Sequence, residues 1–163
     1  MIGYRLGDNF INIQTVIKIQ EELIKMVTLI IGKKGSGKTK KLIQLANEAV
    51  AKSSGNVVVI EKGNGLTYDV THKARLVDTD VYGIKGFDML LGFISGICAG
   101  NYDVTDIFVD STFKIAPEGV NGIEKFVTSL NALAQESGAK ITLLVSSAEG
   151  ELPTGLSAVC EEI

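Results

Sequence analysis

The fold is decided by residues 26–39, which read Met-Val-Thr-Leu-Ile-Ile-Gly-Lys-Lys-Gly-Ser-Gly-Lys-Thr. The first six of them, Met26–Ile31, are apolar and rich in β-branched side chains, which predicts a short strand. A glycine-rich turn follows, and apolar residues then recur at helical spacing between Lys38 and Ala51. A second apolar run, Asn56–Ile60, predicts another strand. Strand, helix and strand in this order form a β-α-β unit, in which the two strands lie parallel.

The same alternation continues through the rest of the chain. The pattern predicts strands at Ala74–Val77, Ile107–Val109 and Lys140–Val145 and helices at Phe87–Ala99 and Val120–Gln135. Strands that alternate with helices predict a parallel sheet with helices on both faces. The expected fold class is therefore α/β, a three-layer sandwich with a mainly parallel central sheet.

The composition fits one compact domain. The chain has 163 residues, of which 45% are hydrophobic and 21% charged. A chain of this length can bury enough surface to fold without disulfides or a structural metal. Its formal net charge of -3 argues against a broad nucleic-acid-binding surface. The longest apolar stretch, residues 89–100, is well short of the roughly 20 residues that a membrane-spanning helix needs, so we expect a buried helix there and no membrane span.

The two cysteines and the single histidine form no metal-binding pattern. Cys98 and Cys160 lie far apart without a CxxC partner, which argues against both a zinc site and a disulfide framework. This cysteine usage is typical of the reducing cytoplasm. His72 lies in a polar segment, residues 62–75, that follows a predicted strand, where open α/β sheets bind ligands. The segment could contact a substrate or partner, although its glycines equally suit a turn and a lone histidine is more often a surface residue.

Residues 1–25 differ from the rest of the chain. Their apolar residues, from Ile11 to Ile24, partly follow helical spacing, and no secretory cleavage site is found. One interpretation is an amphipathic first helix. The other is a native start at Met26, because Gln20-Glu21-Glu22 can be encoded by codons that contain a bacterial ribosome-binding sequence. We therefore expect an N-terminal extension at residues 1–25, which the second interpretation places outside the native product, and one domain at residues 26–163.

The glycine-rich turn satisfies the pattern G-x-x-x-x-G-K-[ST], the Walker A phosphate-binding loop, without departure. Its glycines let consecutive backbone N–H groups turn inward around phosphates, and the following helix adds its positive N-terminal end. In this pattern Lys38 reaches the β- and γ-phosphate oxygens, and the Thr39 hydroxyl is a ligand of Mg2+. The residues expected to hold the phosphates are Gly32, Lys33, Lys34, Gly35, Ser36, Gly37, Lys38 and Thr39.

A second motif supports the first. The predicted strand Ile107–Val109 is followed by Asp110, as in a Walker B strand, where the aspartate holds Mg2+ through water. Aspartates at strand ends also cap turns, so this motif would mean little alone. In a chain that carries the phosphate loop, we expect Asp110 and Thr39 to form the metal site.

On these two motifs the chain from Met26 onward resembles the P-loop NTPase superfamily. The additional strand Asn56–Ile60, which lies between the motifs in the chain, is similar to the RecA-like (ASCE) division. The chain also looks like a small group of bacterial ATP-binding proteins. The resemblance implies the P-loop NTPase fold for residues 26–163, with ATP and Mg2+ as cofactors.

The resemblance also indicates residues for hydrolysis. Many members of this division place a glutamate directly after the Walker B aspartate, where this chain has Ser111. RecA-like proteins can instead supply a carboxylate from the strand after the first helix, and Glu61 stands there. We expect Glu61 to orient the attacking water, the alternative being an exposed Glu61 paired with a lysine. Ser146 and Ser147 follow the strand that ends at Val145, where related folds place a γ-phosphate sensor; hydroxyls there also cap turns.

Two basic residues raise the question of a homo-oligomer. Arg75 is the sole arginine after Met26 and could act as a charge-stabilising finger across a subunit interface, although an isolated arginine is usually a surface residue. Lys33 matches the extra lysine of ParA- and MinD-like dimerising ATPases, although Lys34 stands where that pattern has glycine. The alternative for Lys33 is a basic loop that attracts phosphate.

The leading functional hypothesis is Mg2+-dependent ATP binding with slow hydrolysis, used as a switch or regulatory ATPase that a protein partner recognises. One alternative is a phosphotransferase such as a nucleoside kinase, although the chain lacks the zinc-binding cysteines of type II thymidine kinases. Another is a module that binds nucleotide without chemistry. ATP is the default nucleotide because no guanine-recognising [NT]-K-x-D is present, Asn64 being followed by Gly65.

Overall fold

The computed structural model describes residues 3–6 and 9–163, and the side chains of residues 12–19 and 25–163. Its main sheet has six strands in the order β5-β4-β6-β7-β3-β8. Their bounds are Val27–Gly32 (β3), Asn56–Glu61 (β4), Arg75–Asp78 (β5), Val104–Val109 (β6), Lys140–Ser146 (β7) and Glu161–Glu162 (β8). Every neighbouring pair is parallel, so all carboxyl ends meet at one edge. The predicted parallel sheet is confirmed.

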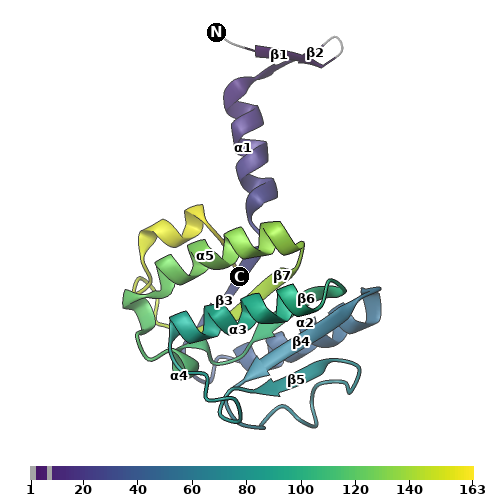
Figure 1. Ribbon diagram of the computed structural model, residues 1–163. Helices are drawn as coiled ribbons and strands as arrows, with labels where there is room; N and C mark the ends of the chain where they lie inside the picture. Colours follow the sequence, from purple (N-terminus) through teal and green to yellow (C-terminus); the bar gives the residue numbers. More distant parts are fainter. Residues whose placement is uncertain (1–2, 7–8) are drawn as a thin grey trace.

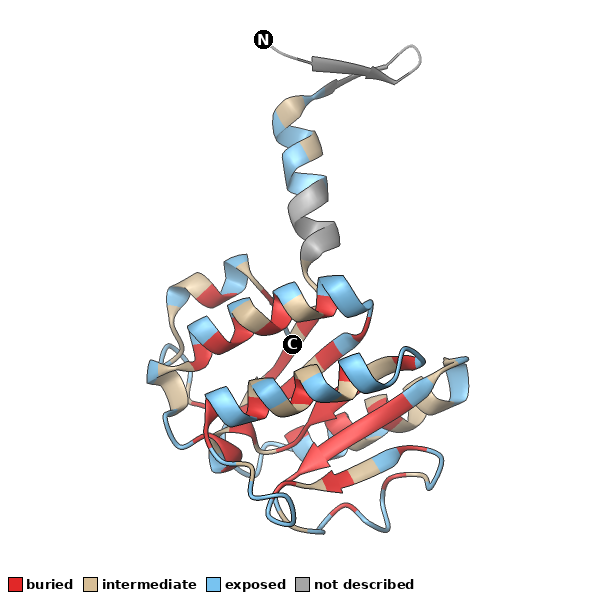
Figure 2. Cartoon of the chain, viewed as in Figure 1, coloured by how far each residue is buried: buried red, intermediate tan, exposed pale blue. Residues whose placement is uncertain are grey.

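Helices cover both faces of this sheet (Figure 1). Helix α2 (Lys38–Lys52) packs on one face, and α3 (Phe87–Gly100) and α5 (Ile123–Ser137) pack on the other. Side chains alternate along each strand, so β4 sends Val59 toward α2 and Ile60 toward the opposite core. Burial on both faces explains why the strands appear in the sequence as continuous apolar runs (Figure 2). The architecture is the expected three-layer α/β sandwich.

Several short elements were not predicted, because a helical segment of three to five residues or a strand of two residues is too short to display a hydrophobic period. They are α4 (Thr112–Ile115), the 3-10 helices η1 (Gly119–Asn121) and η2 (Thr154–Ala158), and strand β8. Strand β8 extends the sheet through Ile163, whose N–H donates to the carbonyl of Leu29 at 2.9 Å. These short elements leave the three-layer arrangement unchanged.

The prediction of a helix over residues 89–100 is confirmed, but the helix is buried on one face only. One face of α3 is buried, with Leu90 and Ile94 inaccessible to solvent, but Met89 on the other face is 50% exposed. Phe93 and Ile97 are only half-buried. The stretch is uniformly apolar in sequence, so only the structure reveals that α3 lies at the surface.

The N-terminal region consists of strands β1 (Gly3–Leu6) and β2 (Asn9–Asn12), which pair antiparallel, and helix α1 (Ile13–Ile24). The Asn12 side chain caps α1 by accepting the N–H of Gln14. A first helix was one of the two interpretations of this region, whereas the hairpin was not predicted. The side chains of residues 20–24, on which part of the amphipathic pattern depends, lie outside the described residues. Helix α1 rises away from the sheet (Figure 1).

Candidate functional site

The glycine-rich loop connects the carboxyl end of β3 to the first turn of α2. Gly35 and Gly37 have φ angles of 80° and 86°, a left-handed conformation that glycine adopts without a steric penalty. A Cβ on Gly32 would lie 2.5 Å from the Ser36 hydroxyl oxygen, so the loop folds back closely on its own start. The glycines that define the sequence pattern are therefore required by the geometry of the turn.

Lys38 is buried although it carries a charge, with 8% of its surface exposed. Its Nζ donates a hydrogen bond to the carbonyl oxygen of Lys33 at 2.6 Å, and the N–H of Ser36 donates to the same oxygen at 3.1 Å. No side chain of the described residues caps the start of α2. The first N–H groups of that helix therefore have no partner within the helix, which makes this end suitable for an anion.

Asp110 meets this loop from strand β6. Val109 lies in the core beneath α3 and α5, so alternation turns Asp110 toward α2. Its Oδ1 accepts the Thr39 hydroxyl at 3.3 Å although the two residues lie 71 positions apart. Its Oδ2 accepts the Ser111 hydroxyl at 2.9 Å. Mg2+ prefers oxygen ligands such as hydroxyl and carboxylate groups. The side chains of Thr39 and Asp110 therefore have the chemistry expected of ligands for this ion.

A cavity of about 620 Å³ opens over the loop. It is lined by Lys34, Gly35, Gly37, Lys38, Thr39, Ser111, Phe113, Lys114, Leu144 and Ser146. Three of these ten residues are lysines and none of the ten is acidic, so the cavity suits an anionic ligand. Of the two serines after Val145, Ser146 lines this cavity. The buried Ser147 instead donates its N–H to the Gly32 carbonyl and its hydroxyl to Glu151.

Glu61 lies on the strand next to Asp110 but is not part of the cavity lining. It is 3% exposed, and its two carboxylate oxygens accept the N–H of Leu66 at 3.2 and 3.1 Å. Burial raises the pKa of Glu61 above its ordinary value, and the nearby Asp110 and Asp78 raise it further. The N–H groups of Leu66 and Gly65 act in the opposite direction. The alternative of an exposed Glu61 paired with a lysine is wrong.

Leu144 of β7 was not recognised in the sequence as a lining residue, and neither were Phe113 and Lys114. The latter two lie on α4, which is too short to show a helical period, and the loop pattern covers none of its residues. The available signal was a positive charge just after the carboxylate of Asp110. Phe113 is half-buried against the core under α3 and α5, whereas Lys114 is exposed.

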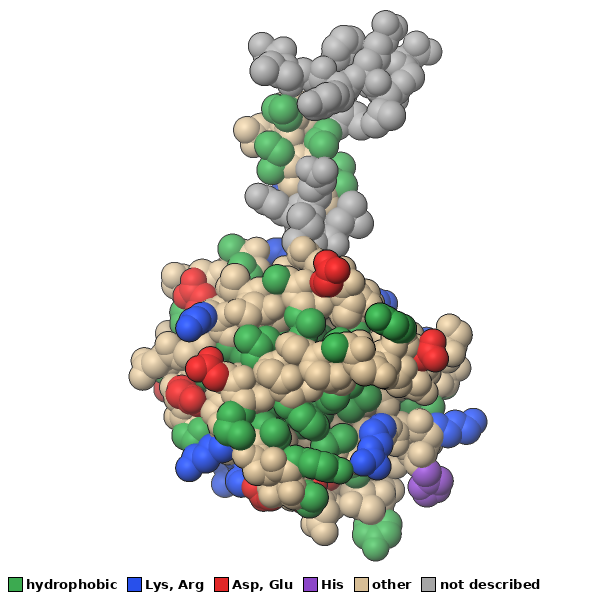
Figure 3. Space-filling view, in the orientation of Figure 1, with side chains coloured by type: hydrophobic (Ala, Val, Ile, Leu, Met, Phe, Trp, Pro, Cys, Tyr) green, Lys and Arg blue, Asp and Glu red, His purple; other side chains and the backbone are tan. Residues whose placement is uncertain are grey.

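The remaining candidates lie elsewhere. Lys33 is exposed and contributes its carbonyl oxygen, rather than its side chain, to the loop. Arg75 is the first residue of β5, an outer strand of the sheet that three strands separate from β3 and its loop. His72, the sole histidine, is exposed on the segment between β4 and β5 and stands at the molecular surface in Figure 3. None of the three side chains lines the cavity over the loop.

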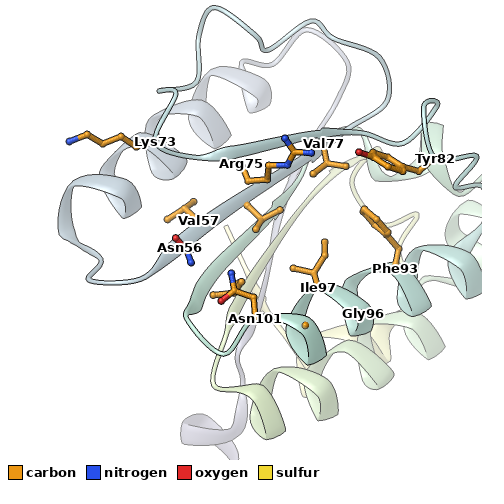
Figure 4. Close-up of a pocket in the computed structure, with 13 residues that line it drawn as sticks. Asn56, Val57, Lys73, Arg75, Val77, Tyr82, Phe93, Gly96, Ile97 and Asn101 are labelled. Atoms are coloured by element: carbon orange, nitrogen blue, oxygen red, sulfur yellow. The ribbon is translucent and has the colours of Figure 1, made fainter.

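A second cavity, of about 580 Å³, lies between α3 and β5. Phe93 and Ile97 of α3 point across it toward the sheet, with Arg75 near one side (Figure 4). The rings of Tyr82 and Phe93 stack with their centroids 6.1 Å apart. Residues of α3, β4 and β5 line this groove. It shares no lining residue with the cavity over the glycine-rich loop.

The arrangement over the loop can hold an anion and a hard cation side by side. Lys38 and the first turn of α2 provide positive charge, and Thr39 and Asp110 provide two oxygen ligands. No model of a known protein family matches the chain, and no curated protein matches it either.

Proposed function

We propose that the chain is a P-loop NTPase of the RecA-like (ASCE) division that binds Mg-ATP, hydrolyses it slowly and works as a switch or regulatory ATPase. The observation that carries this proposal is the contact of Thr39 with Asp110 at 3.3 Å, beside a buried lysine in a glycine-rich loop. The strand order supports it, because β7 lies between the strand before the loop and the strand that ends at Asp110.

Each residue has a role that follows from its position. The loop N–H groups and Lys38 would bind the β- and γ-phosphates, for which the Lys38 ammonium would exchange its bond to the Lys33 carbonyl. Thr39 and Asp110 would hold Mg2+, which when bound neutralises charge on the phosphate oxygens. Ser146 would contact the terminal phosphate from the end of β7.

The expectation of slow turnover comes from the two carboxylate positions. Ser111 follows Asp110, so a glutamate is missing at the usual position for orienting water. The pKa of Glu61 is raised by burial, which makes its carboxylate a stronger base, but its oxygens already accept the N–H of Leu66. Hydrolysis by Glu61 would require that hydrogen bond to be rearranged.

The test compares three proteins in two measurements, Mg-ATP affinity and phosphate release. We expect the wild type to bind Mg-ATP and Lys38→Ala to lose productive binding together with phosphate release. Lys41→Ala is the matched control, because it removes the same charge from the exposed side of the same helix. Unchanged Mg-ATP affinity in Lys38→Ala would contradict the proposal.

A second candidate function is nucleotide binding without hydrolysis. The hydrogen bond from the Leu66 N–H to the Glu61 carboxylate favours this second function. A carboxylate that accepts this hydrogen bond is not free to orient water. In that case the wild type would bind Mg-ATP without releasing phosphate. Release that is present in the wild type and lost in Glu61→Gln would instead favour the slow ATPase.

A further inference from the structure

We propose that Lys114 makes the site prefer a nucleoside triphosphate to a diphosphate by contacting the terminal phosphate. This inference rests on the proposed function and adds a residue that the loop pattern does not contain. It attributes the preference for the triphosphate to the positive charge of a lysine on α4. The ligand class that it names is the triphosphate chain itself, whichever base is attached.

The first observation is that α4 is anchored. Thr112 and Ile115 are 0% and 1% exposed, and the carbonyl of Ile115 accepts the N–H of Gly86 at 2.9 Å. Phe113 is half-buried against the same core. A short helix held on two buried side chains presents its exposed residue in a defined place, and Lys114 there lines the cavity with Lys38 and Thr39.

The second observation is the position of Lys114 relative to the proposed metal ligand. The residues that would hold Mg2+ are expected at the terminal end of the phosphate chain, because the ion would neutralise charge on the β- and γ-phosphates. Asp110 is the proposed ligand on that side, and Lys114 follows it by one short turn. Lys34 and Lys38 belong to the loop, and Lys38 would bind both the β- and γ-phosphates. Lys114 is the lining lysine that comes from outside the loop, so it would add a second positive charge beside the terminal phosphate.

The third observation is the backbone of Ser111. Its φ is 50°, and it is the one non-glycine residue of the described chain with a positive φ. The Ser111 hydroxyl donates to Asp110 Oδ2 at 2.9 Å, which stabilises this left-handed turn between β6 and α4. The turn leads directly into α4, which packs against β7, and Lys114 of α4 lines the cavity.

The fourth observation is charge. Lys114 forms no ion pair within the part of the chain that the structure describes. Its ammonium therefore remains available to a ligand, in a cavity whose ten lining residues include no carboxylate. A triphosphate carries more negative charge at this end than a diphosphate, so a cation here favours the triphosphate.

The experiment measures dissociation constants of the full chain for ADP and for a non-hydrolysable ATP analogue, both with Mg2+. We expect Lys114→Met to weaken binding of the analogue by about tenfold or more and to change ADP binding much less. Lys114→Arg should keep the wild-type preference, because it keeps the charge. Lys140→Met is the matched control: it removes a lysine charge at the start of β7, at the opposite edge of the sheet, and should change neither constant.

Two results would overturn the inference. One is an equal loss of affinity for both nucleotides in Lys114→Met, which would indicate general attraction or a folding defect. The other is unchanged affinity for both. If the wild type binds neither nucleotide, the proposed function fails first and takes this inference with it. If Lys38→Ala abolishes binding while Lys114→Met keeps the full preference, the proposed function stands and only the role of Lys114 is lost.

Discussion

Gly37 is the residue at which backbone geometry and phosphate binding coincide. Its φ is 86° and no atom lies within 4 Å of where a Cβ would stand, so alanine there meets strain rather than a clash. We expect Gly37→Ala to lower the free energy of unfolding by about 1–2 kcal/mol. Because the strain is relieved by turning loop N–H groups away from the phosphates, nucleotide affinity should fall as well.

Gly138 provides the control for this strain. It has a φ of 77°, has equally open surroundings and ends α5 far along the chain. Gly138→Ala should cost a similar free energy of unfolding in urea denaturation but leave nucleotide affinity unchanged. Equal loss of affinity in the two variants would show that Gly37 matters for stability alone.

Glu61 makes the stability of the protein depend on pH. Burial, with Asp110 and Asp78 nearby, raises its pKa above the ordinary value of 4.5, so the folded state holds the proton more tightly than the unfolded state. The stabilising contribution is therefore complete below pH 4.5 and is lost as pH rises through the folded pKa. Glu61→Gln cannot ionise. We expect the wild type to lose stability relative to this variant across that window, measured by urea denaturation at a series of pH values, and parallel pH profiles would contradict the assignment.

Among single residues, the sequence predicted those that belong to a continuous local motif. Gly32, Gly37, Lys38 and Thr39 belong to one continuous motif, and their geometry follows from the turn that the glycines allow. The environment of Glu61 was not predictable, because its burial depends on a loop folding back so that Leu66 donates to it. Contacts of this kind join residues through space that no periodicity connects.

Helix α2 is the element that holds the loop in place. Leu42 is completely buried between α2 and the sheet, in the core that includes Ile30 and Val59. Leu42→Ala should lower the free energy of unfolding by about 2–5 kcal/mol, because it removes buried methyl groups and leaves a cavity. Lys41→Ala, one residue earlier and exposed, should change it by less than about 0.5 kcal/mol in the same denaturation experiment. Similar values for the two variants would mean that α2 is not held by this face.

The elements that sequence predicted are those long enough to show a pattern. The predicted helix from Lys38 and the predicted strand from Lys140 begin where the structure begins them, and each extends one residue further. The second of the predicted strands in the chain, Asn56–Ile60, likewise extends to Glu61. Helix α4 has four residues, about one helical turn, which is too short to show a helical period although a strand of the same length was predicted. It carries Lys114, so a lining side chain was missed together with its element.

At the scale of the molecule, the site is assembled from three separate parts of the chain. The loop after β3, the turn after β6 and the end of β7 meet because these strands are adjacent and parallel, with β7 in the middle. Alternating strands and helices predicted the layers and the edge at which the carboxyl ends gather. The groove between α3 and β5 was not predictable, since it depends on how α3 packs relative to β5 in space.

This assembly gives a prediction that involves the whole fold. A ligand that binds only the folded state raises the free energy of unfolding, by about 2.7 kcal/mol when its concentration is 100 times its dissociation constant. Mg-ATP should therefore raise the melting temperature of the wild type more than ATP with a chelator does, because Thr39 and Asp110 come together only in the folded protein. Asp110→Asn should lose the part of the shift that depends on Mg2+ and keep part of the shift due to ATP. Asp106→Asn, in the first half of β6, should keep both parts of the shift. If the shift of the melting temperature depends equally on Mg2+ in the wild type and in Asp110→Asn, then residues other than Asp110 hold the cation.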